Sequence, residues 1–215
     1  MPGTFPIGRG VRVEVEATLS TTRTVTAVTQ ATVGVATAAA HTLTDGTIAY
    51  FTGVSGMVQL DGQAISVDSP AASTINLEGL NTTAFPAFTG SATLNPIATW
   101  STIGNASGYN IGGGDAADVD QTCLIDDIQQ LTPGLLNAQT VTISGFSSAQ
   151  SAGMQRVLQA ALDQTALTFR ITLKDGQRRV FRAIPSLMNE DGQVGQSLTG
   201  QFTARVVGRV LFLPA

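Results

Sequence analysis

"LTFRITLKDGQRRVFRAIP", residues 167–185, decides the fold class. Apolar side chains alternate with Thr and Arg through its first half, which is the period of a half-buried β-strand. Asp175-Gly176 is a tight-turn dipeptide that supplies the positive φ of a hairpin turn. The chain then returns as a second strand over 178–184, which Pro185 limits. The stretch therefore predicts an antiparallel hairpin.

The residues around this hairpin supply a helix and two further long strands. Ser147 and Gln150 form a capping box that predicts a helix over about 148–163. A core-facing stripe at helical spacing comprises Met154, Val157, Leu158, Ala161 and Leu162. A last long strand is predicted over about 198–212. Residues 11–16 alternate strictly and predict a half-buried strand, with the valines on the buried face and Arg12, Glu14 and Glu16 on the other.

The chemistry changes between about 22 and 95 to short runs of Thr, Ala, Val and Gly. Candidate strands lie at 24–28, 32–37, 47–52, 63–67 and 74–77. Turn dipeptides stand at Asp45-Gly46 and Asp61-Gly62. We expect a small barrel-like or sandwich-like β module here. The whole chain is predicted to be mainly β: a β-sandwich with one flanking amphipathic helix and this additional module.

The charge of the chain is low and unevenly spread. Charged residues make up 12% of the sequence and the net charge is −4, which argues against a protein that grips phosphates. Residues 109–150 hold five aspartates and no cation, whereas 151–215 hold eight cations and four acids. Head-to-tail packing of identical subunits would use this segregation, and solvated patches are the alternative explanation.

None of the candidate chemical motifs is complete. His41 is the only histidine, and the residues around it lack a nucleophile and an orienting acid, so we expect a turn or strand-end histidine. Gly112–Gly114 lacks the Lys-Ser/Thr of a phosphate loop. Asp118 and Asp120 lack the glycine and glutamate of an EF-hand. No enzyme activity and no cofactor are expected.

Two further features bear on location. Cys123 lies between acidic residues, and we expect it to be a small buried apolar residue rather than a nucleophile. The N-terminal residues show no secretory pattern, and no apolar run is long enough to cross a membrane. We therefore expect synthesis in a cytoplasm and no membrane insertion.

A family resemblance is carried by short motifs whose order and spacing match. They are Ile103-Gly104-Asn105, Asp118-Val119-Asp120-Gln121-Thr122, Thr132-Pro133-Gly134-Leu135, Thr140-Val141-Thr142, the helix, the Asp-Gly hairpin and Gly208. Residues 1–21 plus 96–215, taken as one interrupted unit, resemble the tail tube (major tail) protein of long flexible-tailed bacteriophages. The chain would then divide into 1–21, the inserted module 22–95 on the outer surface, and 96–215.

The module has a resemblance of its own. Its matching positions are His41, Asp45-Gly46, Gly53, Gly56-Met57, Gly62, Phe85 and Phe88. They resemble a β module of phage structural proteins that is labelled after the first catalytic-cysteine half-domain of ubiquitin-activating enzyme. This stretch contains no cysteine, so no ubiquitin chemistry is implied.

The tail tube resemblance implies a structural virion protein. Hexameric rings would stack into a tube, with DNA and the tape-measure protein in the bore and with tail terminator and baseplate proteins as further partners. Assembly would take place in the bacterial host cytoplasm. The candidate ring-bridging loop is 109–136. Candidate contact residues between subunits or rings are Gly112, Asp115, Asp118, Asp120, Asp126, Asp127, Pro133, Arg178, Arg179 and Arg182.

Other functions stay open at this point. A tail terminator, a connector or a baseplate protein could use the same fold in single rings. A secretion-system tube subunit is a related possibility. A glycan-binding adhesin is a more distant one, because the module contains few aromatic residues.

Overall fold

A computed structural model describes residues 10–104, 106–123, 127–146, 151–194 and 196–215. The protein is mainly β with one α-helix, as the sequence predicts. The strands of the first half are β1 (Arg12–Leu19), β2 (Arg23–Val25), β3 (Ala27–Val28), β4 (Val35–Thr37), β5 (Ile48–Thr52), β6 (Ala64–Asp68), β7 (Thr74–Glu78) and β8 (Ala92–Thr102). A short 3-10 helix covers Val58–Leu60.

The second half contains the remaining strands and the helix. The strands are β9 (Ala106–Gly112), β10 (Ala116–Asp120), β11 (Leu131–Leu136), β12 (Thr140–Phe146), β13 (Leu167–Thr172), β14 (Arg178–Pro185), β15 (Asn189–Asp191) and β16 (Thr199–Leu213). The helix α1 covers Ala152–Asp163. No helix in the described ranges has the length and apolar character needed to cross a membrane.

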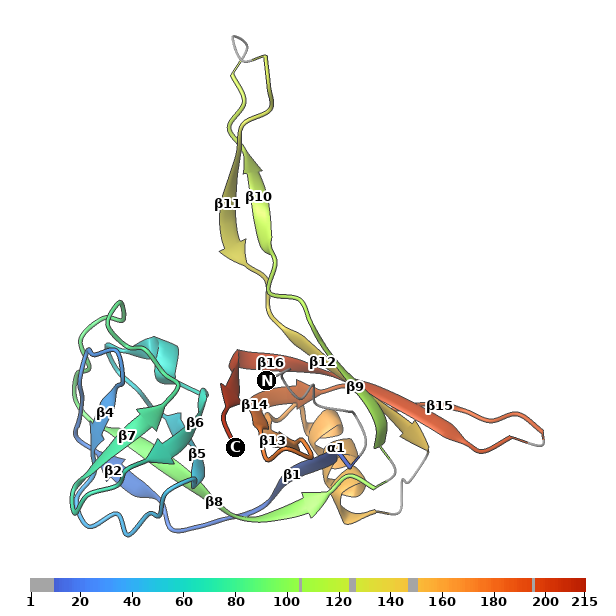
Figure 1. The fold of residues 1–215 in the computed structure, drawn as a ribbon, viewed down its shortest axis with the longest axis horizontal. Coiled ribbons are helices and arrows are strands. Elements are labelled where there is room, and N and C mark those ends of the chain that lie inside the picture. Colours follow the sequence, from blue (N-terminus) through green and yellow to red (C-terminus); the bar gives the residue numbers. More distant parts are fainter. Residues whose placement is uncertain (1–9, 105, 124–126, 147–150, 195) are drawn as a thin grey trace, which may run out of the picture.

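One curled sheet joins most of these strands. Its order is β3-β4-β7-β6-β5-β8-β1-β13-β14-β16-β12-β9, with β2 also paired to β8 and β15 to β16. β10 and β11 pair only with each other and stand away from the rest of the molecule (Figure 1). The predicted β13–β14 hairpin is confirmed, and Gly176 in its turn has φ +89°.

β8 runs through both parts of the sheet. Its first half pairs with β2 and β5, and its second half pairs with β1. Apolar side chains gather in two main cores, one around Phe51 and Leu77 and the other around Phe169 and Phe181. A third cluster between them comprises Ile48, Ala64, Ile97, Val180, Leu211 and Leu213. The division at residues 21 and 95 stays a prediction.

The helix begins later than predicted. Its N-cap is Ser151, whose hydroxyl accepts a hydrogen bond from the backbone N of Met154 at 3.3 Å. The predicted capping box of Ser147 and Gln150 lies outside the described residues. Met154 and Val157 are buried as expected, but Leu162 is 65% exposed, so its predicted place in the core is wrong. Leu162 lies beyond the stripe that faces the sheet.

The prediction that β1 is only half-buried is wrong. Glu14 and Glu16 are buried together with Val13 and Val15, so both faces of the strand are covered. Glu14 Oε2 lies 2.7 Å from Arg170 Nη2, and the Arg170 guanidinium stacks over Trp100 at 4.4 Å. A buried carboxylate persists when an opposite charge and hydrogen bonds compensate it, and Arg170 supplies both.

Two further local expectations, on the strands of residues 22–95 and on His41, can be compared with the structure. The five candidate strands of 22–95 are present, the first as two short strands, β2 and β3. His41 lies in an irregular segment directly after the turn at 39–40, and its Nδ1 accepts a hydrogen bond from the backbone N of Leu43 at 3.1 Å. The backbone carbonyl of His41 accepts a hydrogen bond from Arg23 Nε at 2.9 Å. His41 therefore serves the local architecture.

Candidate assembly surfaces

The predicted bridging loop, 109–136, contains the end of strand β9 and a long hairpin. β10 and β11 pair in antiparallel register, with Asp118 opposite Pro133. The backbone N of Asn137 donates to the carbonyl of Asp115 at 3.0 Å, which closes the base of the hairpin. Figure 1 shows this hairpin projecting from the sheet. We call residues 115–137 the arm.

Glycines set the direction in which the arm leaves the sheet. Gly113 and Gly114 have φ +77° and +88°, a conformation that side-chain-bearing residues rarely adopt. A Cβ at Gly113 would lie 2.9 Å from the carbonyl oxygen of Ala138, so the segments that enter and leave the arm lie too close together there for a side chain. The arm therefore has a defined base.

Side-chain hydrogen bonds organise the distal part of the arm. Asp120 accepts hydrogen bonds from the backbone N and hydroxyl of Thr122 and from Gln129 Nε2. These bonds favour the carboxylate and lower the pKa of Asp120. Thr132 Oγ1 also donates to Gln121 Oε1 at 3.0 Å.

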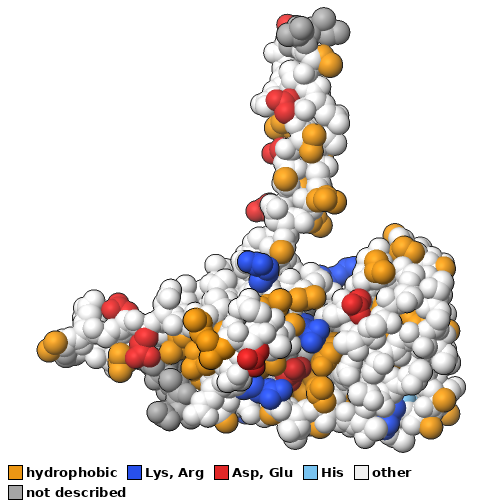
Figure 2. Space-filling model, turned by 180° about the vertical axis from the view of Figure 1, so that it is seen from behind, with side chains coloured by type: hydrophobic (Ala, Val, Ile, Leu, Met, Phe, Trp, Pro, Cys, Tyr) orange, Lys and Arg blue, Asp and Glu red, His pale blue; other side chains and the backbone are white. Residues whose placement is uncertain are grey.

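The surface of the arm is both apolar and acidic. Its exposed apolar side chains are Val119, Ile128, Leu131, Leu135 and Leu136, of which Leu135 is 90% exposed. The arm has no Lys or Arg, and Figure 2 shows apolar and acidic side chains along it. Cys123 is exposed, so its predicted burial is wrong: a two-stranded hairpin has no interior. Isolated hairpins are marginally stable, and exposed apolar patches mark contact sites.

The predicted contact residues fall into two separate groups. Gly112 ends β9, and Asp115, Asp118, Asp120, Asp127 and Pro133 lie on or at the base of the arm. Asp126 lies outside the described residues. Arg178, Arg179 and Arg182 lie on β14, away from the arm.

Two of these arginines contact residues 22–95 of their own chain. The Arg182 guanidinium stacks over the Tyr50 ring at 4.0 Å, and Arg178 Nη1 lies 3.5 Å from the carbonyl oxygen of Gly46. Arg179 stacks over Phe212 at 4.8 Å. Their roles between subunits stay predictions.

Arg182, which is half-buried, also belongs to a row across the sheet that contains the buried side chains of Glu16 and Thr168. Strand register places Trp100 opposite Glu16 and Thr168 opposite Arg182. Burial raises the pKa of Glu16, while Thr168 and the charges of Arg182 and Arg156 act in the opposite direction. The Tyr50 pKa is also raised, by burial first and by the charge of Glu16 second. Arg182 extends this row from β14 to Tyr50 on β5.

Sequence reasoning missed a groove beside the base of the arm. The groove has a volume of about 600 Å³. Its lining comes from Gln59, Gln63, Leu80 and Phe85 on one side and Gly114, residues 136–139, Gly208 and Arg209 on the other. Gly208 was the only sequence signal, since a glycine inside a strand pattern marks a bulge or a close approach.

A second projection was also missed. β15 and the start of β16 form a hairpin that leaves the sheet on another side from the arm (Figure 1). Its exposed apolar side chains are Leu187, Val194 and Leu198. Single apolar residues in a polar stretch gave no periodic signal from which this hairpin could be predicted.

A family model described as "Phage tail tube protein, TTP" matches residues 55–210, which is more than half of the chain. The chain belongs to the phage tail tube protein family. This tail tube protein is therefore a structural component of a phage tail, in a family that is not enzymatic. The family match includes part of the 22–95 region as well as β8–β16.

Other comparisons add a remote structural likeness. A chain in a solved structure titled "Tail of empty GTA particle computed with helical refinement, C6 symmetry" is 16% identical, with a TM-score of 0.44. The alignment covers 54% of this chain and 87% of that chain. No curated protein matches this tail tube protein in sequence.

Proposed function

We propose that this tail tube protein polymerises as stacked hexameric rings and that the arm connects one ring to the next. The observation that carries the proposal is the exposure of Leu135 and its apolar neighbours on a hairpin without a core. Leaving such side chains in water is unfavourable by about 25 cal/mol per Å² of apolar surface, so a partner surface would stabilise the arm.

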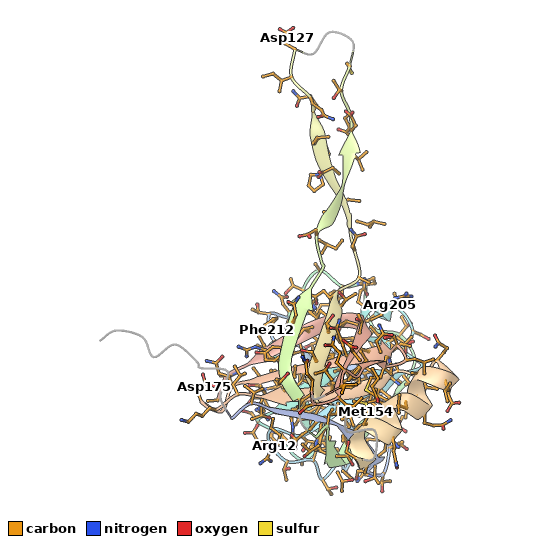
Figure 3. The ribbon with its side chains drawn as sticks, turned by 90° about the vertical axis from the view of Figure 1, so that its right-hand side faces the viewer. Arg12, Asp127, Met154, Asp175, Arg205 and Phe212 are labelled. Atoms are coloured by element: carbon orange, nitrogen blue, oxygen red, sulfur yellow. The ribbon has the colours of Figure 1, made fainter. Side chains whose placement is uncertain are left out.

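Charge also supports assembly through unlike surfaces. The arm is acidic, and exposed arginines lie at its base, where Figure 3 labels Arg205. A subunit with two different complementary surfaces forms heterologous contacts, which give rings or filaments. Stacking of such rings would make the tube.

The bore of this tube would pass DNA without holding it. The net charge of −4 and the single lysine agree with a lumen that does not grip phosphates. Tape-measure, terminator and baseplate proteins would be the other partners, with assembly in the host cytoplasm. Residues 22–95 would form an inserted module on the outer wall of the tube. The module would be of the β type that phage structural proteins share and that is labelled after a half-domain of ubiquitin-activating enzyme, without any ubiquitin chemistry.

Electron microscopy tests the proposal directly. Purified protein, concentrated and held for hours, should form hollow filaments with a regular repeat. Lone rings would instead indicate a terminator, connector or baseplate role and would contradict the tube proposal.

An arm-shortened variant tests the role of the arm. Because Asn137 N bonds to the Asp115 carbonyl, residues 116–136 can be replaced by Asn-Gly, a two-residue hairpin turn. We expect this variant to unfold at the same denaturant concentration as the full chain but to form no long filaments. Long filaments from the variant would show that the arm does not connect rings.

A further inference from the structure

We propose that the groove beside the base of the arm binds the arm of a second copy of the chain. The inference rests on the proposed stacking and names the surface that receives the arm. In this arrangement residues 59–85 take part in tube assembly, rather than only covering its outside.

The groove combines apolar walls with a cation. Phe85 and Leu136 present apolar surface, with Leu136 75% exposed. Arg209 is exposed and its guanidinium lies 5.9 Å from the Phe85 ring centre. Among the described residues, the ion pairs involve Glu14 with Arg12 or Arg170, so Arg209 has no acidic partner there. An apolar segment that carries carboxylates would satisfy both parts of the groove.

The β16 backbone that lines the groove is fixed by hydrogen bonds from two glutamine side chains. Gln63 Oε1 accepts from the backbone N of Arg209 at 2.8 Å, and Gln63 Nε2 donates to the Arg209 carbonyl at 3.2 Å. From the arm side, Gln139 Oε1 accepts from the backbone N of Val210 at 3.1 Å. Both glutamines therefore fix the β16 backbone at the groove, and a preformed surface loses less entropy on binding.

The arm has the complementary chemistry. β10 carries Asp118 and Asp120 on either side of the exposed Val119, β11 carries exposed Leu131 and Leu135, and the arm contains no cation that would repel Arg209. The strands β10 and β11 rise about 3.3 Å per residue, and the bond from the backbone N of Gln121 to the carbonyl of Gln130 continues their pairing beyond β10. Figure 1 shows the arm extending well beyond the rest of its own subunit. The groove lies at the base of the arm, and Figure 1 shows the paired strands of the arm projecting away from that base, so the occupant is another copy.

One arm and one groove per subunit make a contact that can propagate. The two surfaces lie at different places on the molecule, so the contact is heterologous rather than two-fold symmetric. Each subunit can then donate its arm to one neighbour and accept an arm from another.

A disulfide test uses the only cysteine of the chain as a probe. Cys123 is exposed on the distal arm, and Gln59→Cys would place a second thiol at the exposed wall of the groove. Oxidised filaments of this variant should give a ladder of dimers, trimers and larger species on a non-reducing gel. Gln59→Cys combined with Cys123→Ser should give no ladder, and Asp163→Cys on α1 should cross-link no more than the wild type.

The outcomes separate this inference from the proposed function. Filaments without a ladder would overturn the groove assignment and leave the tube proposal intact, whereas a wild type that forms no filaments would contradict the tube proposal itself. Arg209 provides a second measurement. Arg209→Glu should raise the critical concentration for filaments at least about tenfold, because like charges oppose each other, while Arg209→Lys stays near the wild type. Equal critical concentrations for Arg209→Glu and Arg209→Lys would overturn the assignment of the groove as the arm-binding surface.

Discussion

The side-chain amide of Gln63 forms two hydrogen bonds with the backbone of Arg209, at 2.8 and 3.2 Å. The two residues are far apart in sequence, and the bonds join the loop before β6 to a bulge in β16. Gly208 makes the approach possible, since a Cβ there would clash with Gln63 Oε1. This contact and the cluster around Val180 and Leu211 hold the two parts of the molecule together.

Gly208→Ala should therefore destabilise the fold by about 2–4 kcal/mol, since the new methyl group meets Gln63 and the φ of +79° is strained. Urea unfolding measures the loss. Gly90→Ala is the matched control, because Gly90 has φ +73° with nothing within 4 Å, and should lose only about 1 kcal/mol. Equal losses would mean that the Gln63 contact does not constrain Gly208.

Arg170→Ala should destabilise the protein by about 3 kcal/mol, because it leaves the buried Glu14 carboxylate without its partner. Arg12 also lies near Glu14, at 3.8 Å, but its side chain is 67% exposed. Arg12→Ala should change the unfolding free energy by less than about 1 kcal/mol. A similar loss for the two variants would contradict the burial argument.

Glu16→Gln tests the raised pKa of Glu16. A folded-state pKa above the unfolded value means that the native state binds the proton more tightly. This contribution to stability is complete below the unfolded pKa and is lost as the pH rises through the folded pKa. Glutamine mimics the neutral acid and does not titrate. The free energy of unfolding of Glu16→Gln minus that of the wild type should therefore be larger at pH 8 than at pH 4. Urea unfolding of both proteins at pH 4 and pH 8 measures this difference, and the same difference at both pH values would contradict the raised pKa.

Ser151→Ala should cost about 1 kcal/mol, because it removes the acceptor for the Met154 backbone N–H. Ser147→Ala should change the unfolding free energy by less than about 0.5 kcal/mol if Ser151 caps the helix in solution. Thermal unfolding of both variants distinguishes the two serines, and the larger loss at Ser147 would favour the capping box expected from the sequence.

Leu135→Ser should leave the unfolding free energy within about 0.5 kcal/mol of the wild type, because the side chain is 90% exposed. It should nevertheless reduce filament length if the arm contacts another subunit. Val33→Ser, at a 44% exposed position outside the lining of the groove, is the control and should leave filaments unchanged. Filaments of normal length from Leu135→Ser would count against the apolar contact.

The sequence predicted those elements whose signal is local. The alternation of Leu167, Phe169 and Ile171 and the turn at Asp175-Gly176 fix the β13–β14 hairpin within a few residues. The presence of the helix followed from its apolar stripe, but its start did not. A Cβ at Gly153 would lie 2.6 Å from the Thr102 carbonyl oxygen, so packing against the end of β8 constrains the first turn.

The assembly surfaces were only partly predictable. The sequence marked 109–136 as a long acidic connection, but loop and hairpin compositions overlap, and pairing of β10 with β11 leaves no apolar periodicity when both faces are exposed. The groove could not be predicted, since its walls come from residues 59–85 and 114–139 together with β16. The roles of the ten candidate contact residues between subunits stay predictions.

By itself, the sequence determined the mainly β class, the strands of residues 22–77, the β13–β14 hairpin and the acidic character of the arm, because periodicity, turn residues and charge are properties of neighbouring positions. Only the tertiary structure decided that Glu14 and Glu16 are buried, that Arg182 stacks on Tyr50 and that Gln63 meets Arg209. Burial and long-range pairing depend on what covers a strand's second face, and that covering comes from residues distant in the chain.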